Sequence, residues 1–206
     1  MHKNLIVERI VNSVYSSNTF VLACSHAGNT EAWFIDIGDV DAVTDTLPAN
    51  TFVKGVLFTH THYDHIYGMN ELLARYPNIQ FVTNAFGEKA LCSPKLNFSR
   101  YHQETTDLIC DNPERIVVLK EPSFKLFDNV YANVFPTPGH DASCLTYVID
   151  NYVFSGDSYI PGIKTRSTYP NSDRNSVQLS ENLIKKLSFG KTLCPGHGNI
   201  YEDFNC

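Results

Sequence analysis

The segment 59–65, Thr-His-Thr-His-Tyr-Asp-His, constrains this chain more than any other part of its sequence. It places three histidines and one aspartate within six positions, directly after the apolar run 52–58. Imidazole nitrogens and carboxylate oxygens are the ligands that a borderline metal such as zinc prefers. Burying four such groups without partners would be costly, so packing alone does not explain them. The segment therefore predicts a metal site at the end of a buried strand.

Length and composition favour one globular domain over residues 1–206. The chain has 206 residues, 43% of them hydrophobic, which is enough to bury a core without disulfide bonds. Its formal net charge of −6 at pH 7 gives no reason to expect nucleic acid or an anionic membrane as a partner. The expected partner is a small-molecule substrate, and the oligomeric state stays open.

The sequence predicts a cytoplasmic protein. Glu8 and Arg9 interrupt any apolar core of a secretory signal, and no run approaches the roughly 20 apolar residues of a membrane-spanning helix. The six cysteines are scattered and form no C-x-x-C pair, so we expect reduced thiols.

Alternating apolar segments and helical spacings outline an α/β fold. The predicted strands are residues 5–11, 19–25, 31–37, 53–58, 79–83, 115–119, 130–135, 144–149, 151–155 and 191–194. The predicted helices are residues 39–47, 67–76, 84–92 and 176–187. The first three strands should form an antiparallel meander, and the later alternation of strands and helices predicts a sheet covered by helices. The irregular segments 93–113 and 158–175 are candidate loops bordering a site.

Three later segments share one pattern, in which a strand ends, a glycine bends the chain and a potential metal ligand follows. They are 137–140 (Thr-Pro-Gly-His), 154–157 (Phe-Ser-Gly-Asp) and 194–197 (Cys-Pro-Gly-His). Glycine allows a sharp turn and a close approach of the backbone to a bound group. Together with segment 59–65, they supply five histidines and two aspartates at predicted strand ends, which is enough to hold two metal ions.

This order of ligands resembles the signature of the metallo-β-lactamase fold hydrolases. The matching residues are His60, His62, Asp64, His65, His140, Asp157 and His197. The resemblance covers nearly the whole chain and implies a four-layer αβ/βα sandwich, with the metals at one edge between the sheets. It further implies one metal held by His60, His62 and His140. A second metal would be held by Asp64, His65 and His197, with Asp157 bridging the two.

The resemblance predicts a hydrolase with two Zn²⁺ ions, with Fe or Mn as alternatives. Two such ions can hold a bridging hydroxide at neutral pH and polarise a carbonyl oxygen, so no serine or cysteine nucleophile is needed. The predicted reaction is attack of this hydroxide on a small thioester, ester or lactone. Asp64 is the predicted catalytic residue, which would orient the hydroxide or pass on its proton.

Within this family the chain is most similar to the glyoxalase II-like group, which cleaves hydroxyacylglutathione. Segments 137–140, 155–158 and 95–99 (Lys-Leu-Asn-Phe-Ser) bear this similarity, whereas 141–144 reads Asp-Ala-Ser-Cys in place of the usual Thr-Pro-Gly-Ser. Two alternatives stay open. One is a mononuclear iron sulfur dioxygenase that uses His60, His140 and Asp157, a set that suits non-haem iron. The other is a phosphoester or nucleic-acid hydrolase of the same fold.

The loop after Asp157 supplies the candidate substrate contacts. These are Tyr159, Lys164 and Arg166, together with Tyr169. A cation in this loop can hold a carboxylate of the substrate. His102, the one histidine in segment 93–113, is not counted among the ligands.

Overall fold

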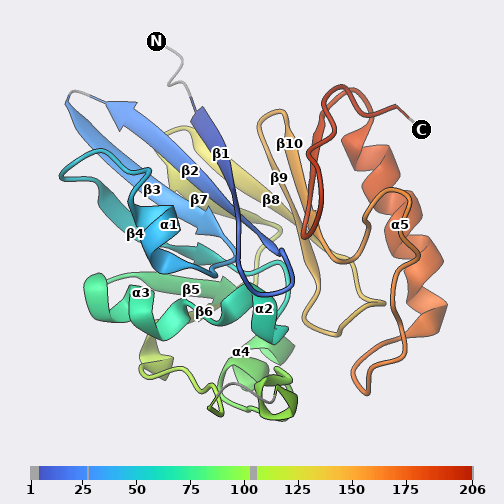
Figure 1. The fold of residues 1–206 in the computed structure, drawn as a ribbon. Coiled ribbons are helices and arrows are strands. Elements are labelled where there is room, and N and C mark those ends of the chain that lie inside the picture. The colour runs from blue at the N-terminus through green and yellow to red at the C-terminus, as the bar shows by residue number, and fades with distance from the viewer. Residues whose placement is uncertain (1–4, 27, 103–105, 206) are drawn as a thin grey trace.

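The computed structural model describes residues 5–26, 28–102 and 106–205. Within these residues two β-sheets pack against each other, with helices on their outer faces (Figure 1). The first sheet contains β1 (Leu5–Val11), β2 (Asn18–His26), β3 (Asn29–Ile35), β4 (Phe52–Leu57), β5 (Gln80–Thr83) and β6 (Ile116–Val118). The second contains β7 (Ser123–Phe127), β8 (Val130–Pro136), β9 (Leu145–Ile149), β10 (Tyr152–Gly156) and β11 (Thr192–Pro195). The helices are α1 (Val40–Thr44), α2 (Tyr63–Ile66), α3 (Met69–Arg75), α4 (Ala85–Leu91) and α5 (Arg174–Ser188), with 3-10 turns at Ser99–Tyr101 and Pro113–Arg115.

The strand order places several chain segments at one edge of the molecule. In the first sheet the order is β1-β2-β3-β4-β5-β6; β1, β2 and β3 pair antiparallel, which confirms the predicted meander. From β3 to β6 the neighbouring strands are parallel. In the second sheet the order is β11-β10-β9-β8-β7, and β10 and β11 are parallel. Because the carboxyl ends of parallel neighbours meet at the same edge, the loops after these strands converge.

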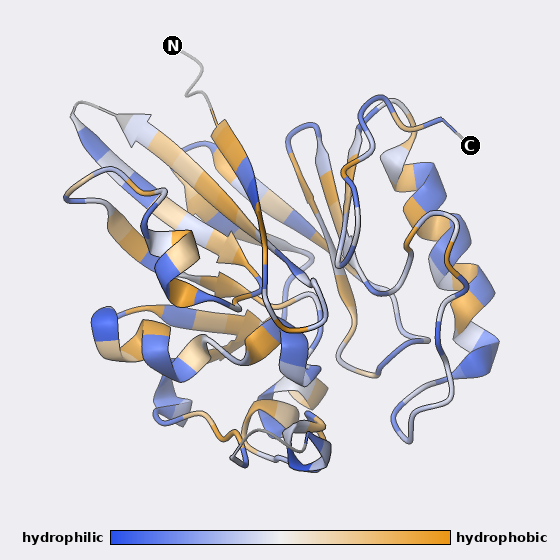
Figure 2. Cartoon of the chain, viewed as in Figure 1, coloured by the Kyte–Doolittle hydropathy of each residue, from blue (hydrophilic) through white to orange (hydrophobic). Residues whose placement is uncertain are grey.

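Three hydrophobic clusters separate the layers. Phe20 and Trp33 of the first sheet pack between the sheets against Tyr147 and Phe154 of the second. A second cluster joins the outer face of the first sheet to α1 and α3, and a third joins the outer face of the second sheet to α5. Hydrophobic residues follow the strands of both sheets, whereas α5 mixes hydrophobic and hydrophilic residues along its length (Figure 2). This arrangement confirms the four-layer αβ/βα sandwich.

Two elements differ from the sequence-based expectation. Strand β7 was not predicted; it has Lys125 at its centre and lies at the edge of the second sheet, where an exposed charge is tolerated. The helix expected over 67–76 begins only at Met69, and a separate helical turn, α2, precedes it. Gly68 lies between the two helices. Only glycine fits there, because a Cβ would lie 2.1 Å from the carbonyl oxygen of Gly38. Asp64 and His65 therefore lie on a helical turn.

The longest helix in the described part of the chain is α5. Its N-cap residue, Asp173, accepts a hydrogen bond from the backbone N–H of Asn175, and Lys185 and Lys186 lie in its last turn, where cations favour the helix dipole. Among the described residues, no helix combines the length and apolar character needed to cross a membrane. Cys92, Cys110, Cys144 and Cys194 are free thiols, and Cys194 packs between the two sheets.

Candidate metal centre

The predicted ligands come from four loops that meet at one edge of the sandwich. His60 to His65 follow β4, and His140 lies in the loop between β8 and β9. Asp157 follows β10 and His197 follows β11, and these strands pair Gly156 with Pro195. The parallel pairing therefore brings Asp157 and His197 to the same point, although they lie far apart in the sequence.

The first group of ligands consists of His60, His62 and His140. Their ligand atoms all lie within 4.8 Å of one another, and His62 Nδ1 is 3.0 Å from His140 Nε2. The Nε2 atom of His60 is buried and has no hydrogen-bond partner among the described residues. A buried polar atom without a partner is costly, so its orientation toward two other imidazoles fits a metal ligand.

The second group consists of Asp64, His65 and His197. His65 Nε2 lies 3.2 Å from His197 Nε2, and Asp64 Oδ2 lies 3.4 Å and 3.3 Å from these two nitrogens. Two imidazoles and one carboxylate thus converge on one position, a donor set that suits a divalent ion such as zinc.

Asp157 connects the two groups. Its Oδ2 lies 3.6 Å from His140 Nε2 and 3.5 Å from His197 Nε2, while its Oδ1 lies 3.6 Å from His65 Nε2. One carboxylate therefore faces ligands of both groups, as the bridging role predicted for it requires. The donor set as a whole fits two metal ions.

The two groups differ in charge. Burial and the neighbouring His62 lower the pKa of His140 to about 4, and burial also lowers that of His60 well below its usual value. Burial alone would lower the pKa of His65, but nearby carboxylates, chiefly Asp64 and Asp36, raise it to about 9. In the same way Asp157 and Asp64 raise the pKa of His197 to about 10 against the effect of burial. A metal ion in the second group would replace these protons, because ligands must be deprotonated to coordinate.

The second nitrogen of each histidine meets a polar atom, which fixes the ring orientation. His140 Nδ1 lies 2.8 Å from the Arg166 carbonyl oxygen, and His197 Nδ1 lies 3.1 Å from that of Tyr15. The other three pairs are His60 Nδ1 with Thr59 Oγ1 at 3.1 Å, His65 Nδ1 with Asp36 Oδ2 at 2.9 Å, and His62 Nε2 with Asp141 Oδ2 at 3.4 Å.

Asp36 is a functional residue that the sequence analysis missed, because an aspartate before Ile-Gly reads as a turn at the end of a strand. Its side chain is fully buried and accepts hydrogen bonds from Thr59 N and Thr59 Oγ1, each at 2.7 Å. The same carboxylate holds His65 Nδ1, so Asp36 supports a ligand and leaves His65 Nε2 facing Asp64 and His197. The available signal was its position at the carboxyl end of β3, the parallel neighbour of β4.

Asp141 is the second missed residue. It is fully buried, and it accepts hydrogen bonds from the backbone N–H and the hydroxyl of Ser143. Ser143 Oγ accepts in turn from Thr61 N and Thr61 Oγ1, each at 3.0 Å. The departure from the usual family sequence at 141–144 therefore joins the His140 loop to the His60–His62 loop.

A family model described as the metallo-beta-lactamase superfamily matches residues 53–197. The chain belongs to the metallo-beta-lactamase superfamily. Two relatives named hydroxyacylglutathione hydrolase are similar to it. That of Pseudoalteromonas translucida (strain TAC 125) is 32% identical over 149 residues, which cover 71% of this chain and 48% of the relative. That of Buchnera aphidicola subsp. Schizaphis graminum (strain Sg) is 29% identical over 178 residues, covering 86% of this chain and 61% of the relative.

A solved structure confirms the fold of this superfamily member. The BLEG-1 B3 metallo-beta-lactamase superposes with a TM-score of 0.83 at 23% identity, covering 95% of this chain and 93% of that one. The chain spans about half to three fifths of the length of the two curated relatives, at 48% and 61%. These similarities establish the family and the architecture.

Two glycines let this superfamily member bring its ligand loops together. Gly156 has a left-handed φ of +51°, and a Cβ there would lie 2.4 Å from Thr59 Oγ1. A Cβ at Gly196 would lie 2.2 Å from Asp157 Oδ1. At both positions the backbone lies so close to a side chain of a neighbouring loop that only glycine fits.

A cavity of about 770 Å³ is lined by ligands of both groups, and only part of the predicted substrate set borders it. Arg166 and Tyr169 line the cavity, whereas Lys164 is exposed outside its lining. Tyr159 is only 8% exposed and packs against Phe204 in the cluster under α5. Tyr159 and Lys164, which were expected to contact the substrate, thus do not line the cavity. The loop turns back after Asp157, where Ser155 Oγ donates to the Tyr159 carbonyl oxygen at 2.8 Å.

Proposed function

We propose that this chain is a hydrolase that uses two zinc ions to cleave a small thioester, ester or lactone. The proposal rests on Asp157, whose carboxylate lies within 3.6 Å of His140, His65 and His197 and so faces both ligand groups. Two zinc ions held there would activate a shared water as the nucleophile and polarise the carbonyl oxygen of the substrate. The relatives named hydroxyacylglutathione hydrolase support hydrolysis and make a thioester the first substrate to test.

Separate sets of residues would bind the two metal ions. His60, His62 and His140 would hold one ion, Asp64, His65 and His197 the other, and Asp157 both. Asp64 also lines the cavity. Although burial opposes it, the neighbouring His65 and His197 lower the pKa of Asp64, so its carboxylate is ionised at neutral pH. It is therefore suited to orient a water molecule by accepting a hydrogen bond from it.

Metal analysis combined with a hydrolysis panel tests this proposal. We expect two zinc ions per chain, and cleavage of at least one member of a thioester, ester and lactone panel. Chelation should abolish that activity and added zinc should restore it. Asp157→Asn should lose both the bound metal and the hydrolysis, whereas Glu202→Gln, an exposed acid in the C-terminal turn, should lose neither.

Two results would contradict the proposal. A single iron per chain together with oxygen uptake would indicate a dioxygenase that uses His60, His140 and Asp157. Two bound metals without cleavage of any carbonyl compound, but with cleavage of a phosphoester included in the panel, would indicate a phosphoesterase.

A further inference from the structure

One wall of the cavity consists of aromatic rings from two separate loops. Phe98 and Tyr169 have ring centroids 5.2 Å apart, and each packs on His62, at 4.9 Å and 5.0 Å respectively. Asn171 Nδ2 donates to the Leu96 carbonyl oxygen at 3.2 Å and so ties the two loops together. The wall is thus fixed against the first ligand group.

A second set of rings borders the other ligand group. Tyr63 packs on His102 with ring centroids 4.5 Å apart, and Tyr15 packs on His102 at 5.3 Å. The carbonyl oxygen of Tyr15 faces His197 Nδ1. Tyr15 and Tyr101 also line the cavity, and their side chains are 67% and 62% exposed. Large ring surfaces therefore stay open toward the cavity, as in sites that bind an apolar or planar ligand.

The cavity is lined by charged side chains of both signs. Its carboxylates are those of Asp64 and Asp157, which belong to the predicted metal ligands, and its lysine and arginine side chains are Lys95 and Arg166. The Arg166 guanidinium lies 4.6 Å above the Tyr169 ring, which holds it in place beside the aromatic wall. Lys95 belongs to the loop that carries Phe98, and Arg166 belongs to the loop that carries Tyr169. Each ring of the aromatic wall therefore has a cation in its own loop.

We propose that the site takes acyl substrates that combine a planar ring with an anionic group. The ring packs on Phe98 and Tyr169, and the anion pairs with Arg166 and Lys95. The inference rests on the proposed hydrolase, since the scissile carbonyl must reach Asp157 and the ligands around it. A cavity of about 770 Å³ accommodates such a molecule. A flexible substrate without a ring would leave the aromatic wall uncovered.

Three thioesters of one thiol, N-acetylcysteamine, separate the two recognition elements. The acyl groups are 3-(4-carboxyphenyl)propanoyl, 3-phenylpropanoyl and glutaryl, which carry ring and anion, ring alone, and anion alone. We expect kcat/KM for the first to exceed each of the others by about tenfold, mainly through KM, because the neutral ring lacks the two ion pairs and glutaryl lacks the aromatic contact. Equal kcat/KM values for all three would overturn the inference while leaving the hydrolase proposal intact.

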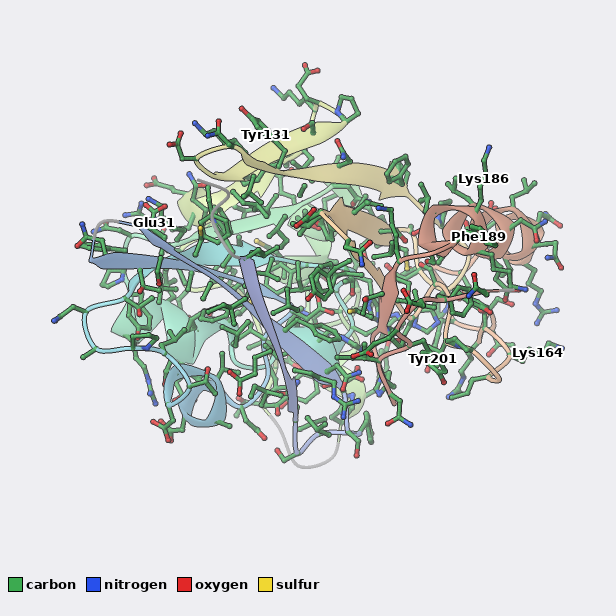
Figure 3. The ribbon with its side chains drawn as sticks, turned by 90° about the horizontal axis from the view of Figure 1, so that it is seen from above. Glu31, Tyr131, Lys164, Lys186, Phe189 and Tyr201 are labelled. Atoms are coloured by element: carbon green, nitrogen blue, oxygen red, sulfur yellow. The ribbon has the colours of Figure 1, made fainter. Side chains whose placement is uncertain are left out.

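Variants locate the effect. Arg166→Gln and Lys95→Gln should each reduce the preference for the carboxylated ring over the neutral ring by about two- to fivefold. Arg166→Gln keeps the backbone carbonyl that faces His140. Lys164→Gln is the matched control, because Lys164 belongs to the same loop but projects outward at the periphery of the molecule (Figure 3). An unchanged preference in both cavity variants, or an equal loss in the control, would contradict the assignment.

A binding measurement keeps the inference testable without turnover. Sulfonates are weak metal ligands, so 2-naphthalenesulfonate and neutral 2-naphthalenemethanol can be compared by calorimetry on the metal-loaded protein. We expect the sulfonate to bind several-fold more tightly and to lose this advantage in Arg166→Gln. If no thioester, ester or lactone is cleaved and the sulfonate still binds selectively, the hydrolase proposal fails and the ring-and-anion site stands. Equal binding of both probes would refute the site.

Discussion

Replacing Asp36 by asparagine should detach the second metal while leaving the fold in place. The Asp36 carboxylate accepts from Thr59 N and Thr59 Oγ1 at 2.7 Å and faces His65 Nδ1 at 2.9 Å. An asparagine can keep its oxygen toward Thr59 N, which places the amide nitrogen opposite His65 Nδ1. Since an amide N–H₂ donates, His65 must then accept at Nδ1 and carry its proton on Nε2. That nitrogen is the one that faces Asp64 and His197.

The structure sets the expected size of this effect. Loss of an outer partner of a metal ligand typically costs 10- to 100-fold in affinity, and a proton on the coordinating nitrogen places this variant near the upper end. We therefore expect about a 100-fold weaker second zinc, or about 2.8 kcal/mol at 1.4 kcal/mol per tenfold change. The first zinc should be weakened less, because only His60 is linked to Asp36, through Thr59 Oγ1, while His62 and His140 have other partners for their second nitrogens.

Competition with a chromophoric chelator measures the two affinities separately, and urea unfolding of the metal-free protein reports on the fold. Asp39→Asn is the matched control. Asp39 follows the same strand and accepts from Ser13 N, Ser13 Oγ and Tyr67, none of which belongs to a predicted metal ligand. Two zinc ions bound to Asp36→Asn with wild-type affinity, or an equal loss in Asp39→Asn, would refute the reasoning.

Three further outcomes follow from the site. Asp141→Asn should weaken binding of the first zinc by about 10- to 100-fold in the same chelator assay and leave the second unchanged. The amide would donate to His62 Nε2 and so move the His62 proton to Nδ1, the nitrogen that faces His140. Equal loss of both metals would contradict this expectation. Gly196→Ala should displace Asp157, since the added Cβ would lie 2.2 Å from its Oδ1. Metal analysis should then show fewer than two zinc ions per chain. Binding of two zinc ions would contradict the expected clash. In the metal-free protein the pKa values of His65 and His197 are raised to about 9 and about 10. The stability that this adds to the folded state is fully present at a pH below the ordinary histidine pKa and is lost as the pH rises through 9 and 10. The urea midpoint should therefore fall between pH 7 and 10, and a midpoint that rises over this range would show that these histidines are neutral.

The candidate ligands could be named from the sequence because they occur in short, local patterns. His60 to His65 lie in one segment, and each later ligand directly follows a glycine at the end of a strand. Neither prediction requires knowing which other segments pack nearby. A residue that follows a strand and a glycine turn lies at the edge of a sheet. The structure brings all seven ligands together at that edge.

The supporting residues were not predictable in this way. Asp36 and Asp141 look like ordinary turn aspartates, and their value depends on contacts with His65 and His62, which lie far away in the sequence. Tyr159 shows the opposite case: it follows the bridging aspartate by two positions, yet its ring turns into the core beside Phe204. Proximity in sequence does not fix the direction of a side chain once a loop folds back.

The sequence by itself therefore predicted the class of fold, which the structure confirms, and the candidate metal ligands, because periodic apolar strands and clustered ligand residues are properties of short segments. The tertiary structure decided which carboxylates hold the histidine rings and how two distant loops join through Phe98 and Tyr169. It also placed Arg166 beside that aromatic wall and Lys164 outside the cavity. These features arise only when parallel strands bring separate loops to one edge, where each side chain is fixed by neighbours that the linear order does not reveal.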